Sequence, residues 1–240
     1  MEGKKTGFFE APPQTMFFFG LVTGIALVLI FQSLLGGGNG NTRVVNNNTI
    51  PTPINDNTGG YVTPTTVNVP TISKDDRVRG NRNAKVVLYE YSDLQCPFCQ
   101  RHHATMQTLL SQYGDDVAWV YRHLPLTSIH PEAQPAALAA ECVGEQEGDE
   151  GFFTFVDEIF AQQSSMGSAL YTSIAQDMGL NMTKFNDCVS SQKYLSKIQD
   201  QTQTALGQGM GATPSTVVDG QLIEGAETLA KFTAIIDSIL

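Results

Sequence analysis

The sequence predicts an α/β fold in which helices flank a mixed β-sheet. A run of β-forming residues at 85–91 precedes a helical pattern at 97–113, and an apolar strand follows at 117–121. A strand–helix–strand order of this length is typical of two parallel strands joined by a crossover helix. Near the end of the chain, Asp219-Gly220 separates two short β-forming runs and predicts an antiparallel hairpin. Together these patterns predict a sheet with both parallel and antiparallel strands.

The other elements follow from the spacing of apolar residues. Residues 73–84 are polar and are expected to be irregular. A block of helices is expected after the second strand, at 130–144, 152–163, 169–178, 183–190 and a segment ending near 206. The hairpin strands are expected at 215–219 and 221–224, and a last amphipathic helix at 228–240.

An apolar stretch at 17–35 stands apart from these patterns. It would form about 28 Å of helix, close to the thickness of the hydrocarbon core of a bilayer. We therefore expect an N-terminal transmembrane helix, with 1–35 as a cytoplasmic stub and uncleaved signal anchor. Lys4 and Lys5 precede it and only Arg43 follows closely, so the N-terminus is expected in the cytoplasm. Cleavage near 33–38, or a buried core helix, are the alternatives.

The segment after the anchor is rich in Gly, Asn, Thr and Pro. It has too few large apolar residues to form a core, so 36–72 is expected to be a flexible linker. The remaining 73–240 is expected to be one domain. The formal net charge of −10 argues against a nucleic-acid-binding protein, which would carry a basic face.

The chemistry is expected at Cys96-Pro97-Phe98-Cys99, where the first strand meets the helix. Pro97 suits the first helical turn because the missing N–H is not needed there. A thiolate at Cys96 would be stabilised by the helix dipole, and the thiolate is the reactive form of cysteine. The alternatives are an inert disulfide or half of a zinc site, but tetrahedral zinc needs four ligands.

Four segments resemble the DsbA-like thiol:disulfide oxidoreductases of the thioredoxin superfamily. They are the run Glu90-Tyr-Ser-Asp-Leu-Gln-Cys-Pro-Phe-Cys99, Gly211-Ala-Thr-Pro-Ser215, Gly220-Gln-Leu-Ile-Glu-Gly225 and the helical block. The resemblance covers about 73–240. It implies a thioredoxin-like mixed sheet flanked by helices, with a helical insertion at about 127–190.

The resemblance also implies roles for the residues of the redox motif. Cys96 matches the exposed nucleophile, Cys99 the buried resolving cysteine, and Pro97-Phe98 the dipeptide that tunes the couple. Strongly oxidising members carry histidine where this chain has Phe98. A phenyl ring adds no charge to stabilise the Cys96 thiolate, so this position departs from the pattern of the strongly oxidising members.

Three further site residues come from the same resemblance. Pro214 matches a cis-proline that lies against the disulfide, and Thr213 is the residue before it. Glu90 matches a buried acid that relays a proton to Cys99. The alternative for Glu90 is a half-buried strand acid paired with a lysine.

Cys142 and Cys188 lie in the helical block, far from the motif. Disulfides persist in exported domains, and similar pairs occur in some DsbA-like proteins as a structural bridge. A structural disulfide is therefore expected, with a second redox pair or free thiols as alternatives.

The remaining candidate residues are expected to have structural or solvent-exposed positions rather than catalytic roles. Arg101, His102 and His103 are expected on a solvated helix face, with tuning of the thiolate or substrate contact as the alternative. His123 and His130 are expected to be structural, and Trp119 to lie in the core.

The resemblance implies an extracytoplasmic thiol:disulfide oxidoreductase that acts on exported protein substrates through Cys96 and Cys99, as an oxidase. It requires no metal or organic cofactor, and a quinone-linked membrane partner is expected to reoxidise it. The alternatives are a disulfide reductase or isomerase, or a non-catalytic holdase with the thioredoxin fold.

Overall fold

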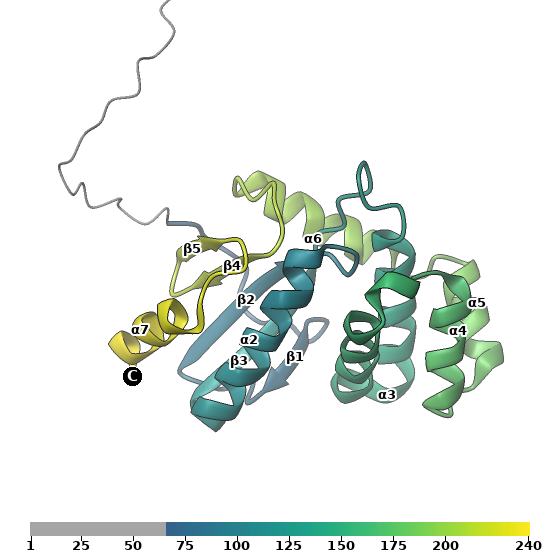
Figure 1. Cartoon of the computed structure of the whole chain (residues 1–240), viewed down its shortest axis with the longest axis horizontal. Helices are drawn as coiled ribbons and strands as arrows, with labels where there is room; N and C mark the ends of the chain where they lie inside the picture. Colours follow the sequence, from purple (N-terminus) through teal and green to yellow (C-terminus); the bar gives the residue numbers. More distant parts are fainter. Residues whose placement is uncertain (1–65) are drawn as a thin grey trace, which may run out of the picture. The chain divides into compact units, whose positions relative to one another are not determined.

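One β-sheet organises the part of the chain that the computed structural model describes, residues 66–240. Its five strands lie in the order β1-β3-β2-β4-β5 (Figure 1). The strands are β1 (Arg77–Gly80), β2 (Val86–Ser92), β3 (Val117–His123), β4 (Ser215–Val218) and β5 (Gln221–Glu224).

The predicted strand pairing is confirmed. Strands β2 and β3 are parallel, with Glu90 beside Tyr121, whereas β4 runs antiparallel to both β2 and β5. The sheet is therefore mixed, as the strand–helix–strand unit and the hairpin predicted.

The expectation that 73–84 is irregular is wrong, because β1 pairs antiparallel with β3 at the edge of the sheet. The strand was not predicted because its side chains are mostly polar. Arg77 and Arg79 point to one side and form ion pairs with Glu141 and Asp157, while Val78 is buried on the other side. An edge strand with charged side chains is difficult to distinguish from a loop by hydrophobicity alone.

Six α-helices complete the domain described here. They are α2 (Pro97–Tyr113), α3 (Ala133–Ala161), α4 (Ser168–Asp177), α5 (Met182–Ser190), α6 (Leu195–Gly207) and α7 (Leu229–Ile239). Two predicted helices, at 130–144 and 152–163, are joined in α3, and the backbone is non-helical only at Gly148, where φ is 69°. Glycine tolerates this left-handed φ without a side-chain clash.

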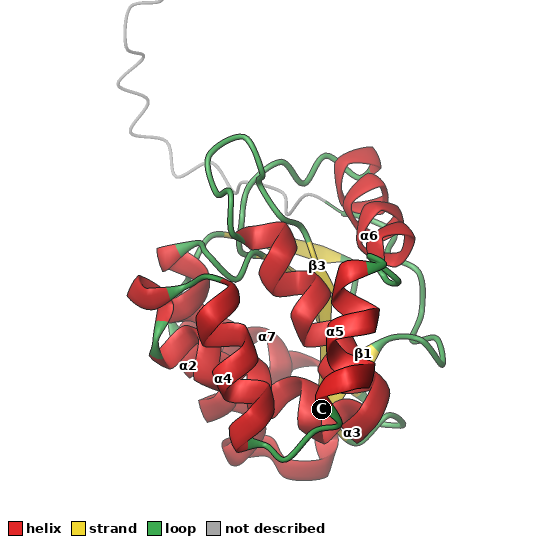
Figure 2. Ribbon diagram, turned by 90° about the vertical axis from the view of Figure 1, so that its right-hand side faces the viewer, coloured by secondary structure: helices red, strands yellow, loops and turns green. Residues whose placement is uncertain are grey.

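Helices cover both faces of the sheet. Helices α2 and α7 pack together on the face that carries Leu88 and Trp119, while Ala205 of α6 packs with Tyr91 on the opposite face. Helices α3, α4 and α5 gather at the β1 side of the sheet, away from β4, β5 and α7 (Figures 1 and 2). Trp119 is fully buried, as expected.

The first described residues pack on the domain. Val67 is buried, and its backbone N–H donates a hydrogen bond to the carbonyl of Gly220 at 2.8 Å. The packed domain thus includes part of the expected linker, since Val67 adds an apolar side chain to the core. Within 66–240 no helix is both long and apolar enough to cross a membrane. The expected anchor at 17–35 lies outside the described residues.

Candidate active site

The redox motif lies where β2 delivers the chain to the N-terminus of α2. Cys96 is the residue that caps α2, and Pro97 occupies the first turn. The backbone N–H groups of this turn have no partner within the helix, so they can face a thiolate. The local sequence explains the geometry, because proline begins a helix readily and β-branched residues favour the strand before it.

The two cysteines differ in their surroundings. Cys96 is 4% exposed, and its Sγ lies 3.5 Å from the carbonyl oxygen of Thr213. Cys99 is fully buried, and its Sγ accepts a hydrogen bond from the backbone N–H of Asp93 at 3.4 Å. Both are free thiols in this structure, which therefore shows the reduced form of the pair.

The surroundings shift the two thiol pKa values in opposite directions. The pKa of Cys96 is lowered to about 5, mainly by the hydrogen bond that the Cys99 thiol donates, with help from backbone N–H groups of the helix turn. Burial raises the pKa of Cys99 well above its usual value, and the nearby Cys96 and Glu90 charges add to this. The pair therefore combines a thiolate at Cys96 with a thiol at Cys99; the expectation that Cys96 is exposed is wrong, because 4% of it is accessible in this structure.

A loop before β4 forms the other wall of the site. The peptide bond between Thr213 and Pro214 is cis. The Pro214 carbonyl accepts a hydrogen bond from the Gly225 N–H at 2.8 Å, and the Ser215 hydroxyl donates to the Ala212 carbonyl at 2.8 Å. These bonds hold the Thr213 carbonyl against Cys96.

Glu90 lies beneath the motif on β2. It is fully buried, and neither carboxylate oxygen has a hydrogen-bond partner among the described residues. Burial raises the pKa of Glu90 to about 7, although the neighbouring polar groups of Ser92 and Trp119 oppose the rise. No lysine or arginine of the described chain forms an ion pair with it, so Glu90 can exchange a proton near neutral pH.

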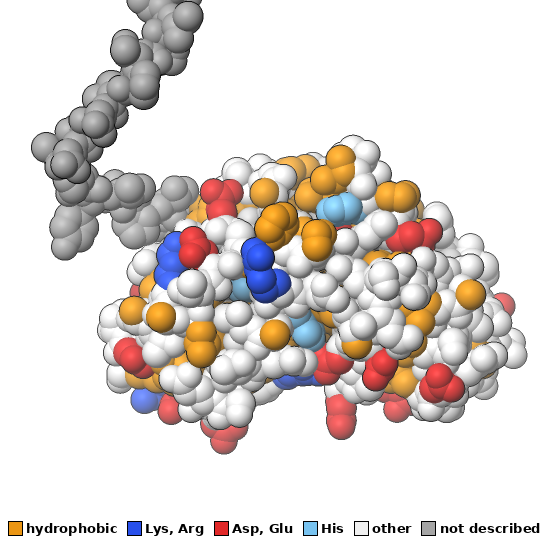
Figure 3. All heavy atoms as spheres, viewed as in Figure 1, with side chains coloured by type: hydrophobic (Ala, Val, Ile, Leu, Met, Phe, Trp, Pro, Cys, Tyr) orange, Lys and Arg blue, Asp and Glu red, His pale blue; other side chains and the backbone are white. Residues whose placement is uncertain are grey.

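The rim around Cys96 is apolar. Phe98 is 54% exposed beside the nucleophile, and the Arg101 guanidinium lies 5.0 Å from the centre of its ring. Ile129, in the loop between β3 and α3, is 67% exposed. In Figure 3 hydrophobic atoms gather in the upper middle of the face, where Figure 1 places the start of α2, next to a basic side chain. Exposed apolar side chains that gather in one place are typical of a surface that contacts another molecule.

The expectation that His102 and His103 lie on a solvated helix face is wrong. Both are buried; His102 hydrogen-bonds Thr216 on β4 at 3.0 Å, and His103 bonds Asp157 on α3 at 2.6 Å. Burial lowers the pKa of His102 to about 4, so it is neutral. One imidazole of α2 therefore faces the sheet and the other faces α3. The polarity of histidine alone would place both side chains in solvent.

Asp93 is a site residue that the sequence analysis missed. Its buried carboxylate accepts hydrogen bonds from the backbone N–H groups of Gln95 and Leu126, both at 2.8 Å, and from His130 Nδ1 at 2.8 Å. Its own N–H faces Cys99. The aspartate therefore connects the motif with the loop that carries Ile129. Its position three residues before Cys96 was the one available signal.

Three glutamine side chains also attach the motif to neighbouring segments. Gln163, just after α3, donates its amide N–H groups to the carbonyls of Leu94 and Cys96 at 2.9 and 3.0 Å. Gln95 accepts from the N–H of Glu132 at 2.7 Å, and Gln100 donates to the carbonyl of Phe160 at 2.5 Å. No sequence pattern indicates these bonds.

The helical block carries a disulfide of its own. Cys142 on α3 and Cys188 on α5 are bonded, with their Cα atoms 5.8 Å apart. Beside it, the buried carboxylate of Glu141 meets Arg77, Lys197 and His123, at 2.8, 2.7 and 3.2 Å. Burial opposes the ionisation of Glu141, but the hydrogen bond to His123 and the charges of Lys197 and Arg77 outweigh it and lower the pKa of Glu141 to about 2. His123 thus contributes to packing, as expected.

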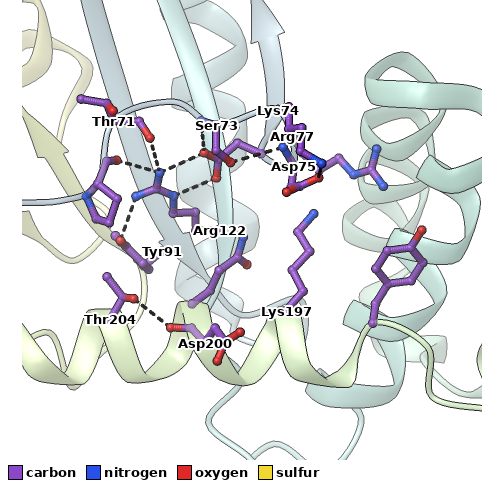
Figure 4. A pocket seen from close by; sticks show the side chains of 14 residues that line it. Thr71, Ser73, Lys74, Asp75, Arg77, Tyr91, Arg122, Lys197, Asp200 and Thr204 are labelled. Atoms are coloured by element: carbon purple, nitrogen blue, oxygen red, sulfur yellow. Dashed lines mark hydrogen bonds and ion pairs between the residues drawn. The ribbon is translucent and has the colours of Figure 1, made fainter.

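A cavity of about 530 Å³ lies between the chain before β1, Arg122 on β3, and α6 (Figure 4). Its charged groups largely neutralise one another: Arg122 pairs with Asp76 at 3.0 Å, and Lys197 pairs with Glu141. Neither cysteine of the motif lines it. It is separate from the redox site.

Residues 66–240 contain no cluster of three or more histidine, cysteine or acidic side chains arranged to hold an ion.

A redox-motif helix, a cis-proline loop and a mixed sheet define the thioredoxin class, and the chain belongs to the Thioredoxin family, whose sequence model matches residues 72–238. Among solved structures, it is similar to BdbD from Bacillus subtilis, with a TM-score of 0.64, 19% identity, and coverage of 73% of this chain and 98% of that one. For α-DsbA1 from Wolbachia pipientis the TM-score is 0.62 and the identity 23%, over 70% and 92% of the two chains.

The curated relatives that match this chain in sequence are named Na(+)/H(+) antiporters. The chain is 31% identical over 170 residues to the Na(+)/H(+) antiporter NhaA 1 of Salinispora arenicola, covering 71% of this chain and 26% of that protein. A second match, to NhaA 3 of Salinispora tropica, has 32% identity over the same 26% share. The chain thus spans about a quarter of the length of these relatives.

Proposed function

We propose that this protein is a thiol:disulfide oxidoreductase that introduces disulfides into exported protein substrates through Cys96 and Cys99. The observation that carries the proposal is the contrast between a thiolate at Cys96 and a buried thiol at Cys99, held against a cis-proline loop. A leaving thiolate of low pKa makes its disulfide more oxidising, which favours the oxidase direction.

The cycle starts from the oxidised pair. A substrate thiolate attacks Cys96 Sγ, a substrate–Cys96 bond forms, and the Cys96–Cys99 bond breaks. Cys99 leaves with the electron pair and takes up a proton, which Glu90 can supply from beneath. A second substrate thiolate then attacks the substrate sulfur of the mixed disulfide. The substrate leaves oxidised, and Cys96 leaves as a thiolate.

The surrounding groups assist these steps by position. The backbone at Thr213 offers hydrogen-bonding groups to an extended substrate segment, and the exposed ring of Phe98 offers an apolar contact. The Asp93 N–H lies where negative charge develops on Cys99.

The cellular setting belongs to the same proposal. We place the domain outside the cytoplasm, attached by the apolar stretch at 17–35, with a quinone-linked membrane protein as its reoxidant. The Cys142–Cys188 disulfide supports this, because such bonds persist in oxidising compartments. No metal or organic cofactor enters the proposed cycle.

The test compares the full chain with Cys96→Ser in the oxidation of a reduced, unfolded protein that carries two thiols. We expect the oxidised wild type to form the substrate disulfide and Cys96→Ser to lose this turnover completely, since the variant cannot form the Cys96–Cys99 disulfide. The combined Cys142→Ala and Cys188→Ala change is the control and should retain turnover.

Two other outcomes would contradict the proposal. A reduction potential near about −270 mV, the value of a reductant, instead of near about −120 mV, would reverse the direction of electron flow. Suppression of substrate aggregation that persists unchanged in Cys96→Ser, without turnover in the wild type, would indicate a holdase.

A further inference from the structure

Two exposed side chains of α2 contact each other beside the redox motif. Phe98 lies between the two cysteines in sequence and is 54% exposed. Arg101 follows it by three residues, a spacing that places both side chains on one side of the helix. The Arg101 guanidinium lies 5.0 Å from the centre of the Phe98 ring, within the range of a cation–π contact. An exposed positive charge is thus held next to the motif.

Arg101 differs from the other arginines of residues 66–240 in what it contacts. Each of the others forms an ion pair with an acidic side chain of the protein; they are Arg77, Arg79, Arg82 and Arg122. Arg101 has no such partner in this part of the chain, although the whole sequence carries a formal net charge of −10. Its N–H groups are therefore available to a carboxylate of another molecule.

The acids that belong to the hydrogen-bond network of the motif do not neutralise this charge. Asp93 is buried, and its carboxylate accepts a hydrogen bond from His130. Glu132, the residue before α3, accepts a hydrogen bond from the Tyr171 hydroxyl at 2.9 Å. The positive charge of Arg101 therefore stays uncompensated on a protein that is acidic overall.

The Cys96 thiolate does not account for Arg101 either. The pKa of Cys96 is lowered mainly by the Cys99 thiol, with help from backbone N–H groups of the helix turn, and Arg101 is not among these groups. Of the two roles that the sequence left open for Arg101, contact with a substrate fits its position better than tuning of the thiolate.

We propose that Arg101, supported by the Phe98 ring, is a specificity-determining residue that selects protein substrates with a carboxylate close to the reacting cysteine. The inference rests on the proposed exchange function and deepens it by naming a class of substrate. A substrate cysteine that reacts at Cys96 brings the neighbouring residues of its segment to the start of α2. A guanidinium there can donate to both oxygens of one carboxylate.

The contact with Phe98 makes this recognition more effective. The ring restricts the arginine before the substrate arrives, so less conformational entropy is lost on binding. An ion pair at the rim of an interface acts mainly on the rate of association, and salt screens it. A lysine in the same place in the substrate would meet a like charge. The expected preference is therefore modest, sensitive to salt, and dependent on one side chain.

The experiment measures how fast the reduced full chain reacts with two peptides. Each peptide carries one cysteine that is joined to 2-thiopyridine by a disulfide, and the two differ only in having glutamate or lysine on both sides of that cysteine. The Cys96 thiolate attacks the peptide sulfur, a Cys96–peptide bond forms, and the bond to the thiopyridine sulfur breaks. Thiopyridine leaves with the electron pair and takes up a proton, and its absorbance gives the rate constant.

We expect the wild type to react roughly fivefold faster with the glutamate peptide at low salt, since an exposed ion pair contributes modestly. Arg101→Glu should reverse this preference, and added salt should reduce it in both proteins. Each protein is judged by the ratio of its two rate constants, so a change in the reactivity of Cys96 itself cancels.

Lys184→Glu is the matched control. Lys184 is exposed in the first turn of α5, and it forms no ion pair in the described residues. The two changes alter the net charge of the protein by the same amount. Helix α5 packs on α3 and α4, and an acid in its first turn suits the helix dipole. Lys184→Glu should therefore keep the wild-type ratio.

The outcomes separate the recognition from the function on which it rests. A wild-type ratio at or below one would overturn the recognition by Arg101 and leave the exchange function intact, because Cys96 has reacted. The same holds if Lys184→Glu changes the ratio as much as Arg101→Glu, since the effect would then come from the net charge. If the wild type reacts with neither peptide, the proposed function fails, and the recognition fails with it.

Discussion

Two cysteines on one helical turn differ in what surrounds each sulfur. Cys96 caps the N-terminal end of α2, where unpaired N–H groups and the Cys99 thiol face its sulfur. The pKa of Cys96 is therefore lowered to about 5. Cys99 is one turn further into the core, where burial opposes ionisation. Two cysteines three residues apart thus have pKa values that are shifted in opposite directions.

The first prediction concerns the ionisation of Cys96. In the reduced protein, the rate of alkylation by iodoacetamide should be half-maximal near pH 5 and constant above it, because the thiolate is the form that reacts. Cys99→Ala should move this midpoint to higher pH, since the hydrogen bond from the Cys99 thiol is the largest cause of the lowered pKa. A wild-type midpoint near 9, the ordinary value, would contradict the structure.

At the scale of elements, the site depends on contacts between segments far apart in sequence. The strand β2, the turn after α3 and the loop before β4 all place groups within hydrogen-bond distance of the motif. Gln163 donates to two carbonyls of the segment that leads into α2, including that of Cys96. The Gln163 amide is therefore one of the side chains that connect the helical block to the redox motif.

Gln163→Ala should test this transmission. Removing two hydrogen bonds, each of which contributes about 0.5–1.5 kcal/mol, should loosen the start of α2. We expect disulfide exchange with a protein substrate to slow a few-fold, and the alkylation midpoint of Cys96 to rise. Stopped-flow mixing with a reduced substrate measures the first effect and pH-dependent alkylation the second.

The neighbouring residue offers the control. The Gln162 side chain donates to the exposed carboxylate of Glu158 and not to the motif, so Gln162→Ala should leave both measurements unchanged. Equal effects from the two changes would mean that Gln163 has no special link to the motif.

At the scale of the whole molecule, the disulfide in the helical block is separate from the redox site. It joins α3 to α5 across 46 residues of sequence. The bond restricts the unfolded chain, and a loop of this length contributes about 4 kcal/mol on the chain-entropy account. We therefore expect this bond to stabilise the helical block whatever the state of Cys96 and Cys99.

Replacing both Cys142 and Cys188 by alanine should lower the unfolding temperature by roughly 10 °C, given about 2–4 °C per kcal/mol for a domain of this size. Calorimetry of the oxidised protein measures this, and the exchange rate at 25 °C should be retained. Loss of exchange in a variant that is still folded would show that this disulfide takes part in the redox chemistry.

Local sequence determined much of this protein. The β-forming run before Cys96, Pro97 after it, and Asp219-Gly220 each specify a strand end, a helix start or a hairpin through neighbouring residues alone. The parallel pair, the hairpin and the location of the redox motif could therefore be predicted.

The rest required the tertiary structure, because it depends on which distant groups meet. Strand β1 is stabilised by ion pairs between its arginines and acidic side chains of α3. His102 and His103 are buried because β4 and α3 supply partners, which no periodicity reveals. The raised pKa of Glu90 likewise follows from burial, a property of the packed chain rather than of any segment of it.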